Sequence, residues 1–293
     1  MRARASRTAV LVCQGRAAAH DRIAVGRFSD PVAMSLLQDG ERTVVQQERR
    51  DAPPKGWGAR MNYEFVRGCA ALMAPRTIAI DDAIREHPSE QLVILGAGLD
   101  ARAWRMGELA GTIAFEVDHP ATQGDKRQRL GQRTPAAREV RFVATDLAQQ
   151  GIGAALDRAG HRTEAPTTWV WEGVVPYLTA AQVVATVAAV QTRSAPGSRL
   201  VVNYQVPSTK AAVGQLIGRG MMRLARSPDP WSDEPHRSHW TPDQLSSLLE
   251  AHGFSTISDR DLLEISLALG LPRRAGDLGG SLPNGHVLLA DRR

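Results

Sequence analysis

A short hydrophobic run followed by a glycine-rich turn constrains this chain more than any other feature. Residues 92–95 are Leu-Val-Ile-Leu, which have the length and apolar character of a buried strand. Gly96-Ala97-Gly98 follows at once, and two glycines so placed let the backbone turn sharply and approach a ligand closely. With Ala101 the turn satisfies the pattern G-x-G-x-x-A, which is shared by nicotinamide enzymes and other nucleotide-binding proteins. The turn therefore predicts a nucleotide site without identifying the nucleotide.

Strand and helix patterns alternate after this turn. Further strands are predicted at residues 112–117, 140–144, 167–171, 199–204, 255–259 and 286–291. The β-α-β order predicts an α/β fold, a doubly wound and mostly parallel sheet that binds its ligand at the carboxyl ends of the strands. The closing pair of strands predicts one antiparallel C-terminal strand, which is the arrangement of class I methyltransferases, with their Rossmann-like sheet, rather than of dehydrogenases.

Two regions do not follow this alternation. Residues 1–90 contain helical patterns at 6–24, 32–37 and 63–86, with a polar stretch at 38–60 in which a loop is predicted at 51–56. We expect them to form an N-terminal helical appendage packed on a core domain of residues 91–293. Pro, Gly, Met and basic residues interrupt the core at about 207–240, which predicts an insertion that covers the substrate.

Composition argues against several classes of protein. The chain has 293 residues and only two cysteines without metal-ligand spacing, so neither a disulfide framework nor a metal site is expected. The net charge of +5 comes from scattered basic residues, which argues against nucleic-acid binding and is compatible with a small anionic partner. No apolar run approaches 18 residues, and the N-terminal run 8–13 is too short for a signal peptide. We expect a cytoplasmic protein that does not bind a membrane, and the oligomeric state stays open.

Acidic residues follow the predicted strands. Glu116 and Asp118 end the second strand, at about the distance beyond the glycines at which nucleotide sites place a carboxylate on the ribose. We favour Asp118 and leave Glu116 open. Asp146 could accept a hydrogen bond from an adenine amino group while the Leu147 backbone N–H serves a ring nitrogen, although Asp is also a common helix N-cap. Glu172 ends the fourth strand and is the candidate beside the reacting groups.

Six blocks in order extend these observations over most of the chain. They are SRTA with RA and FSDPVA, then RT with DD, LGAGLDARAWR, FEVDHPATQGDKRQRL, ATDL and WEGVVPYL. This series resembles the leucine carboxyl methyltransferase family, in particular its bacterial branch of S-adenosylmethionine-dependent proteins. The resemblance implies S-adenosyl-L-methionine as the cofactor.

The resemblance also implies a role for each matching residue. The implied cofactor contacts are Gly96 with its neighbours Ala97 and Gly98, Asp118 for the ribose, Asp146 and Leu147 for the adenine, Glu172 near the amino-acid portion, Arg76 for the methionine carboxylate and, less closely matched, Arg16. A guanidinium suits that task because it holds a carboxylate through two parallel charge-assisted hydrogen bonds. Asp100 and Arg102 are expected to pair with each other near the loop.

The same family resemblance predicts an O-methyltransferase. A small-molecule carboxylate is the first choice of acceptor, and a protein or peptide C-terminal carboxylate is the second. A carboxylate is ionised at pH 7 and needs no general base, whereas a phenol or alcohol would need one, for which Tyr177, His119 and His236 are the candidates. An NAD-dependent oxidoreductase and a non-catalytic nucleotide-binding protein are the alternatives from other classes.

The acceptor pocket is predicted between the insertion and the N-terminal helices. Met221, Met222, Trp231 and Trp240 are candidates for an apolar wall, although ordinary packing beneath a loop would use the same residue types.

Overall fold

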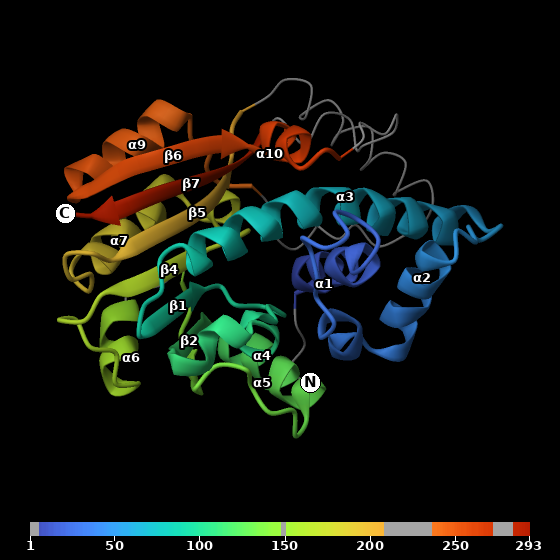
Figure 1. The fold of residues 1–293 in the computed structure, drawn as a ribbon, viewed down its shortest axis with the longest axis horizontal. Coiled ribbons are helices and arrows are strands. Elements are labelled where there is room, and N and C mark those ends of the chain that lie inside the picture. The colour runs from blue at the N-terminus through green and yellow to red at the C-terminus, as the bar shows by residue number, and fades with distance from the viewer. Residues whose placement is uncertain (1–5, 148–150, 208–235, 272–283) are drawn as a thin grey trace.

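The computed structural model describes residues 6–147, 151–207, 236–271 and 284–293 (Figure 1). Within them, seven strands form one sheet in the order β3-β2-β1-β4-β5-β7-β6. The strands are β1 (Gln91–Leu95), β2 (Ile113–Asp118), β3 (Glu139–Ala144), β4 (Thr167–Trp171), β5 (Arg199–Gln205), β6 (Phe254–Asp261) and β7 (Gly285–Arg292). Each lies within two residues of its predicted range.

The sheet confirms the predicted class. β1 to β5 pair in parallel, whereas β7 is antiparallel to both of its neighbours, β5 and β6. β1 lies between β2 and β4, so the order of the strands reverses direction there. A doubly wound sheet forms its ligand crevice at this reversal, outside the carboxyl ends of the strands.

The N-terminal region is more helical than its sequence suggests. Its elements are α1 (Arg7–Ala19), the 3-10 helix η1 (Ala33–Leu36), α2 (Asp39–Arg49) and the long α3 (Trp57–Arg85). The predicted loop at 51–56 is confirmed between α2 and α3, whereas α2 forms from the polar residues before it, for which no helix was predicted. The Gln38 backbone N–H donates to Glu41 Oε2 at 2.8 Å, and Val45 is fully buried, so a start signal and one apolar contact fix a helix of otherwise polar residues.

Helices cover both faces of the sheet. Those after β1 are α4 (Arg102–Arg105), η2 (Gly107–Gly111), α5 (Pro120–Leu130), α6 (Ile152–Arg158), η3 (Val175–Tyr177), α7 (Ala180–Gln191), α9 (Pro242–Ala251) and α10 (Leu262–Ala268). One buried apolar cluster joins α6, α7 and α9 to one face of the sheet. A second cluster joins α1, α3 and α10 to the other face, with Ala17, Ile78 and Ile94 among its members. The N-terminal helices therefore share a core with the sheet.

α3 connects the sheet with the other N-terminal helices. It begins beside α2, passes over α1 and ends near β4 and β5 (Figure 1). No helix in the described parts of the chain has the length and apolar character needed to cross a bilayer. Most of the predicted insertion, with Met221, Met222 and Trp231, lies outside the described residues. Trp240 is described, and its indole N–H donates to Ser238 Oγ at 3.2 Å.

Candidate cofactor site

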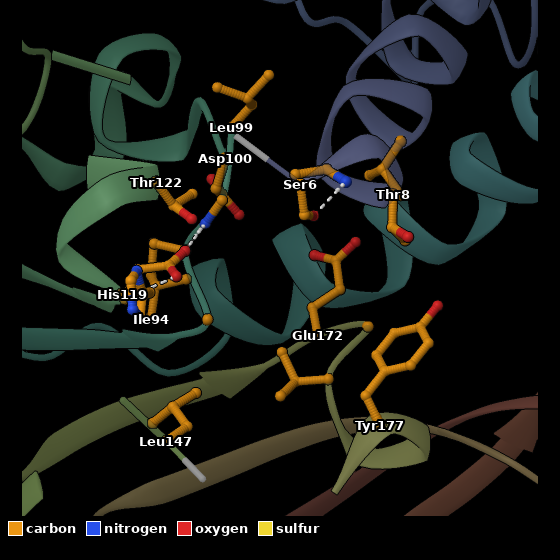
Figure 2. Close-up of a pocket in the computed structure, with 18 of the residues that line it drawn as sticks. Ser6, Thr8, Ile94, Leu99, Asp100, His119, Thr122, Leu147, Glu172 and Tyr177 are labelled. Atoms are coloured by element: carbon orange, nitrogen blue, oxygen red, sulfur yellow. Dashed lines mark hydrogen bonds between the residues drawn. The ribbon is translucent and has the colours of Figure 1, made fainter. Parts of the chain in front are cut away.

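A cavity of about 510 Å³ lies at the carboxyl edge of the sheet, where the N-terminal turn of α1 faces the loops after β1, β2, β3 and β4 (Figure 2). This volume lies in the range of small-ligand sites. The predicted residues that line it are Arg16, Arg76, Gly96, Ala97, Gly98, Asp118, His119, Asp146, Leu147, Glu172 and Tyr177. The sheet thus brings together most of the residues that the sequence singled out.

The glycine turn after β1 forms part of the cavity wall. Gly96 and Gly98 have φ angles of +69° and +47°, in the left-handed region that favours glycine. The backbone N–H groups of Gly96 and Ala97 both donate to the Val117 carbonyl oxygen, at 2.8 and 3.1 Å, which fixes the turn to β2. A Cβ at position 96 would lie only 2.3 Å from Val174 Cγ2, so any larger residue there would displace Val174, which lines the same cavity.

Asp118 presents a carboxylate to the cavity at the end of β2. Its Oδ2 accepts from the Gly98 N–H at 2.5 Å and its Oδ1 accepts from the His119 N–H at 2.6 Å (Figure 2). Burial raises the pKa of Asp118, and these backbone donors act against that rise. A carboxylate has about four acceptor positions, so two remain for hydroxyl groups. This geometry suits a ribose.

Glu116 is not among the residues that line the cavity, so the structure does not support the prediction of Glu116 as a cofactor ligand. Its side chain is fully buried beneath α5 and lies 2.6 Å from Lys126 Nζ. Residues 116 and 118 share one face of β2 because side chains alternate along a strand. α5 covers Glu116, whereas Asp118 lies at the end of β2 and lines the cavity.

Arg76 and Glu172 form a buried ion pair at the opposite end of the cavity, where Figure 2 shows Glu172 across from His119. Arg76 Nη2 lies 2.7 Å from Glu172 Oε1, while the Arg76 Nε is buried without a hydrogen-bond partner among the described residues. Glu172 also lies 2.7 Å from Arg102 Nη1. Burial alone would raise the pKa of Glu172, but the guanidinium groups of Arg102 and Arg76 lower it well below its usual value. Glu172 is therefore an ionised counterion rather than a proton-transfer group.

These two residues belong to a larger set of buried charges. Arg102 pairs with Asp100, as predicted, and lies 2.8 Å from Asp81 of α3. Arg16 donates to Asp30 at 3.0 Å and to the Leu99 carbonyl oxygen at 2.5 Å. The members connected by ion pairs among the described residues are the four arginines Arg16, Arg76, Arg102 and Arg105 and the four acids Asp30, Asp81, Asp100 and Glu172. We call this set the buried charge network, and its formal charges balance.

The candidate bases have other contacts. His119 Nδ1 accepts from the Ala121 N–H at 3.2 Å and caps the start of α5. The Tyr177 ring, carried by η3 beside Glu172 (Figure 2), packs edge-on against His236 with ring centroids 5.5 Å apart. No group of three or more metal-ligating side chains occurs in the described part of the chain.

Several cavity residues escaped the sequence reasoning. The start of α1 supplies Ser6 and Thr8, and further lining comes from Thr122, Val174 and Arg237. Ser6 carries a recognisable signal as a helix N-cap, since its Oγ accepts from the Ala9 N–H at 3.1 Å. Its place at the cavity follows only from the packing of α1 on α3.

Comparison with known proteins identifies the family. The profile of the family described as leucine carboxyl methyltransferase matches residues 9–191. A "Putative S-adenosyl-L-methionine-dependent methyltransferase" of Mycobacterium sp. (strain JLS) is 32% identical over 241 residues, which cover 76% of this chain and 73% of the relative. The chain belongs to the leucine carboxyl methyltransferase family. A relative of the same description in Streptomyces coelicolor is 35% identical over 204 residues, or 67% of this chain and 66% of the relative.

Other similarities cover less or show the fold alone. A relative in Mycobacterium sp. (strain MCS) is 38% identical over 120 residues, which are 39% of this chain and 49% of the relative. The matched part thus spans about half the length of that family member. The crystal structure of a DUF574 family protein from Streptomyces avermitilis is similar over 99% of this chain and 98% of its own, with a TM-score of 0.57 and 14% identity. A crystal structure from Thermobifida fusca covers 99% and 96%, with a TM-score of 0.56 and 14% identity.

The Mycobacterium and Streptomyces relatives are described as S-adenosyl-L-methionine-dependent, and the cavity of this chain suits that cofactor. Asp118 has acceptor positions for ribose hydroxyls, and the guanidinium of Arg76, which lines the same cavity, suits the carboxylate of the methionine portion. A pyrophosphate would need the N-terminus of the helix after the glycine turn. In α4 that position is taken, because the Arg102 N–H donates to Asp100 Oδ1 at 2.7 Å. Together with the family match, this favours a methyltransferase over the nicotinamide-dependent alternative.

Proposed function

We propose that this protein is an O-methyltransferase that transfers the methyl group of S-adenosylmethionine to a carboxylate of a small molecule. The observation that carries the proposal is one cavity with Asp118 at one end and Arg76 at the other, on the carboxyl edge of a methyltransferase sheet. A nucleoside with an amino-acid tail needs those two groups at opposite ends.

The residues of the chain would act by binding and alignment. Asp118 would hold the ribose, Asp146 and Leu147 the adenine, and Arg76 the carboxylate of the amino-acid portion, while Gly96 permits close approach of the backbone. When bound, the cofactor supplies an electrophilic methyl group on a sulfonium. Holding two reactants in line can account for much of the rate of such a displacement.

A carboxylate acceptor agrees with the protonation of the site. Arg102 and Arg76 keep Glu172 ionised at low pKa, and His119 is engaged as the cap of α5, so both are poor general bases. An acceptor that is already ionised at pH 7 has no proton to give up. A phenol or an alcohol would need a base, for which Tyr177 at the cavity wall and His236, whose ring packs on it, remain the candidates.

A labelling experiment tests the function. The protein is incubated with methyl-tritiated S-adenosylmethionine and a small-molecule extract of cells that carry the gene, with Arg76→Ala as the matched control. We expect label in a small molecule that releases tritiated methanol in alkali, as methyl esters do, and a gain of one methyl group by mass spectrometry.

Other outcomes would contradict parts of this proposal. Alkali-stable label would indicate an ether or an amine as the product. Alkali-labile label on protein would favour the protein C-terminal carboxylate as the acceptor. S-adenosylhomocysteine binding without transfer to any component would favour a non-catalytic nucleotide-binding protein.

A further inference from the structure

Three arginines line the cavity, and they differ in their partners. Arg16 pairs with Asp30 and Arg76 pairs with Glu172, both as members of the buried charge network. The side chain of Arg237 is exposed and has no ion pair or hydrogen bond within the described ranges of the chain. Arg237 therefore gives the cavity a positive charge that the described residues leave uncompensated.

The backbone fixes Arg237 at the cavity wall. The Arg237 N–H donates to the Pro176 carbonyl oxygen at 2.7 Å, and Ser238 Oγ donates to the Val175 carbonyl oxygen at 3.3 Å. Both acceptors belong to η3, which also carries Tyr177. The Tyr177 ring in turn packs on His236, the residue before Arg237. Contacts made by Arg237 and by its two neighbours in the chain thus attach this segment to η3.

We propose that Arg237 binds the carboxylate of the methyl acceptor and selects anionic acceptors over neutral ones. This inference rests on the proposed function. The cofactor's own carboxylate is matched by Arg76, so a second, solvent-accessible guanidinium on the same cavity fits a second anion. If Arg237 holds one carboxylate oxygen, the other is left to form the new O–CH₃ bond while the CH₃–S bond breaks, and no proton moves.

The same contact would favour release of the product. Methylation turns the carboxylate into a neutral ester, which cannot form an ion pair with a guanidinium. The charge-assisted hydrogen bonds that hold the acceptor are therefore lost at the moment of transfer. An acceptor without a carboxylate would lack them from the start.

The test uses Arg237→Gln and Arg237→Lys, with Arg260→Gln as a matched control on the surface of β6. Alkali-labile label is measured with tritiated S-adenosylmethionine over a series of extract concentrations, and S-adenosylhomocysteine affinity is measured by calorimetry. For Arg237→Gln we expect the half-saturating extract concentration to rise about tenfold or more, with a maximal rate within about threefold of the wild type. Arg237→Lys should restore part of the loss, and cofactor affinity should stay unchanged in all variants.

The outcomes separate this inference from the proposed function. No alkali-labile label from the wild type overturns the proposed function and the inference with it. Label from the wild type with unchanged half-saturation in Arg237→Gln overturns only the role of Arg237. A loss of S-adenosylhomocysteine affinity in Arg237→Gln would overturn it as well, because it would assign the side chain to the cofactor.

Discussion

The two ends of the cavity hold their charges in different ways. At the β2 end, Asp118 is held by backbone N–H groups of the neighbouring loop and of the next residue. At the opposite end, Arg76 comes from α3 and Glu172 from the end of β4, and each depends on the other's charge. At the β2 end the carboxylate is held by backbone groups, whereas at the arginine end the ion pair joins side chains of elements that are far apart in the sequence.

This difference sets what each end tolerates. Backbone donors stay in place as long as the loop keeps its shape, so the environment of Asp118 does not depend on any one side chain. The buried charge network is favourable only while it is complete, because removing one member leaves opposite charges buried without compensation. The arginine end should therefore be the more fragile of the two.

Arg102→Ala should produce the largest effect. Arg102 is almost fully buried and contacts Asp81, Asp100 and Glu172, so its loss leaves three carboxylates short of a partner. We expect the free energy of unfolding to fall by about 3–5 kcal/mol, measured by urea denaturation.

The control for that variant is Arg260→Ala, whose partner Glu264 is exposed. Exposed pairs contribute about 0–1 kcal/mol, so this variant should unfold close to the wild type. Equal losses in the two variants would remove the distinction between the buried charge network and an ordinary surface pair.

Arg76→Ala should come next and should act on one part of the ligand. We expect the dissociation constant for S-adenosylhomocysteine to rise about 10- to 100-fold, because a charge-assisted contact to its carboxylate is lost. The constant for adenosine, which lacks the amino-acid tail, should change much less. Calorimetry with both ligands checks this, and the same factor for both would mean that Arg76 serves the whole cavity rather than its arginine end.

Asp118→Ala should weaken both ligands alike, by about 1–3 kcal/mol, since both carry the ribose. Glu116→Gln is the matched control on the same face of β2 and should leave the affinity for adenosine unchanged. If instead Glu116→Gln weakened adenosine and Asp118→Ala did not, the ribose ligand would be Glu116 and the cavity geometry would be misleading.

The last effect concerns pH and arises at Glu116, which is buried beneath α5. Burial raises the pKa of Glu116 from 4.5 to about 7, against the lowering effect of Lys126. Between these values the folded state binds more protons than the unfolded state, so the free energy of unfolding should fall as the pH rises through this window, by about 2–3 kcal/mol. Urea denaturation at pH 5 and pH 7.5 should show a shallower fall in Glu116→Gln. The same fall in both proteins would assign the pH dependence to another group.

The sequence predicted well those features that depend on neighbouring residues. Strands appeared from their apolar runs, and Asp118 and the glycine turn appeared from their positions at strand ends, because strand register and chain order place them together. α2 was missed because its composition is polar and only one face, at Val45, is buried. Glu116 could not be separated from Asp118 by pattern alone, since the two lie on the same face and only the position of α5 distinguishes them.

By itself the sequence determined where the strands lie along the chain, the sharp turn at Gly96 and the family to which the blocks belong, because each depends on residues that are close together in the chain or that follow in a fixed order. Only the tertiary structure decided that Glu172 is the counterion of Arg76 and Arg102, and that Ser6 and Arg237 line the same cavity. Pairings of this kind depend on how α1 and α3 pack against the sheet. That packing is a sum of many non-directional apolar contacts, which fix the position of a charged side chain without marking it in the sequence.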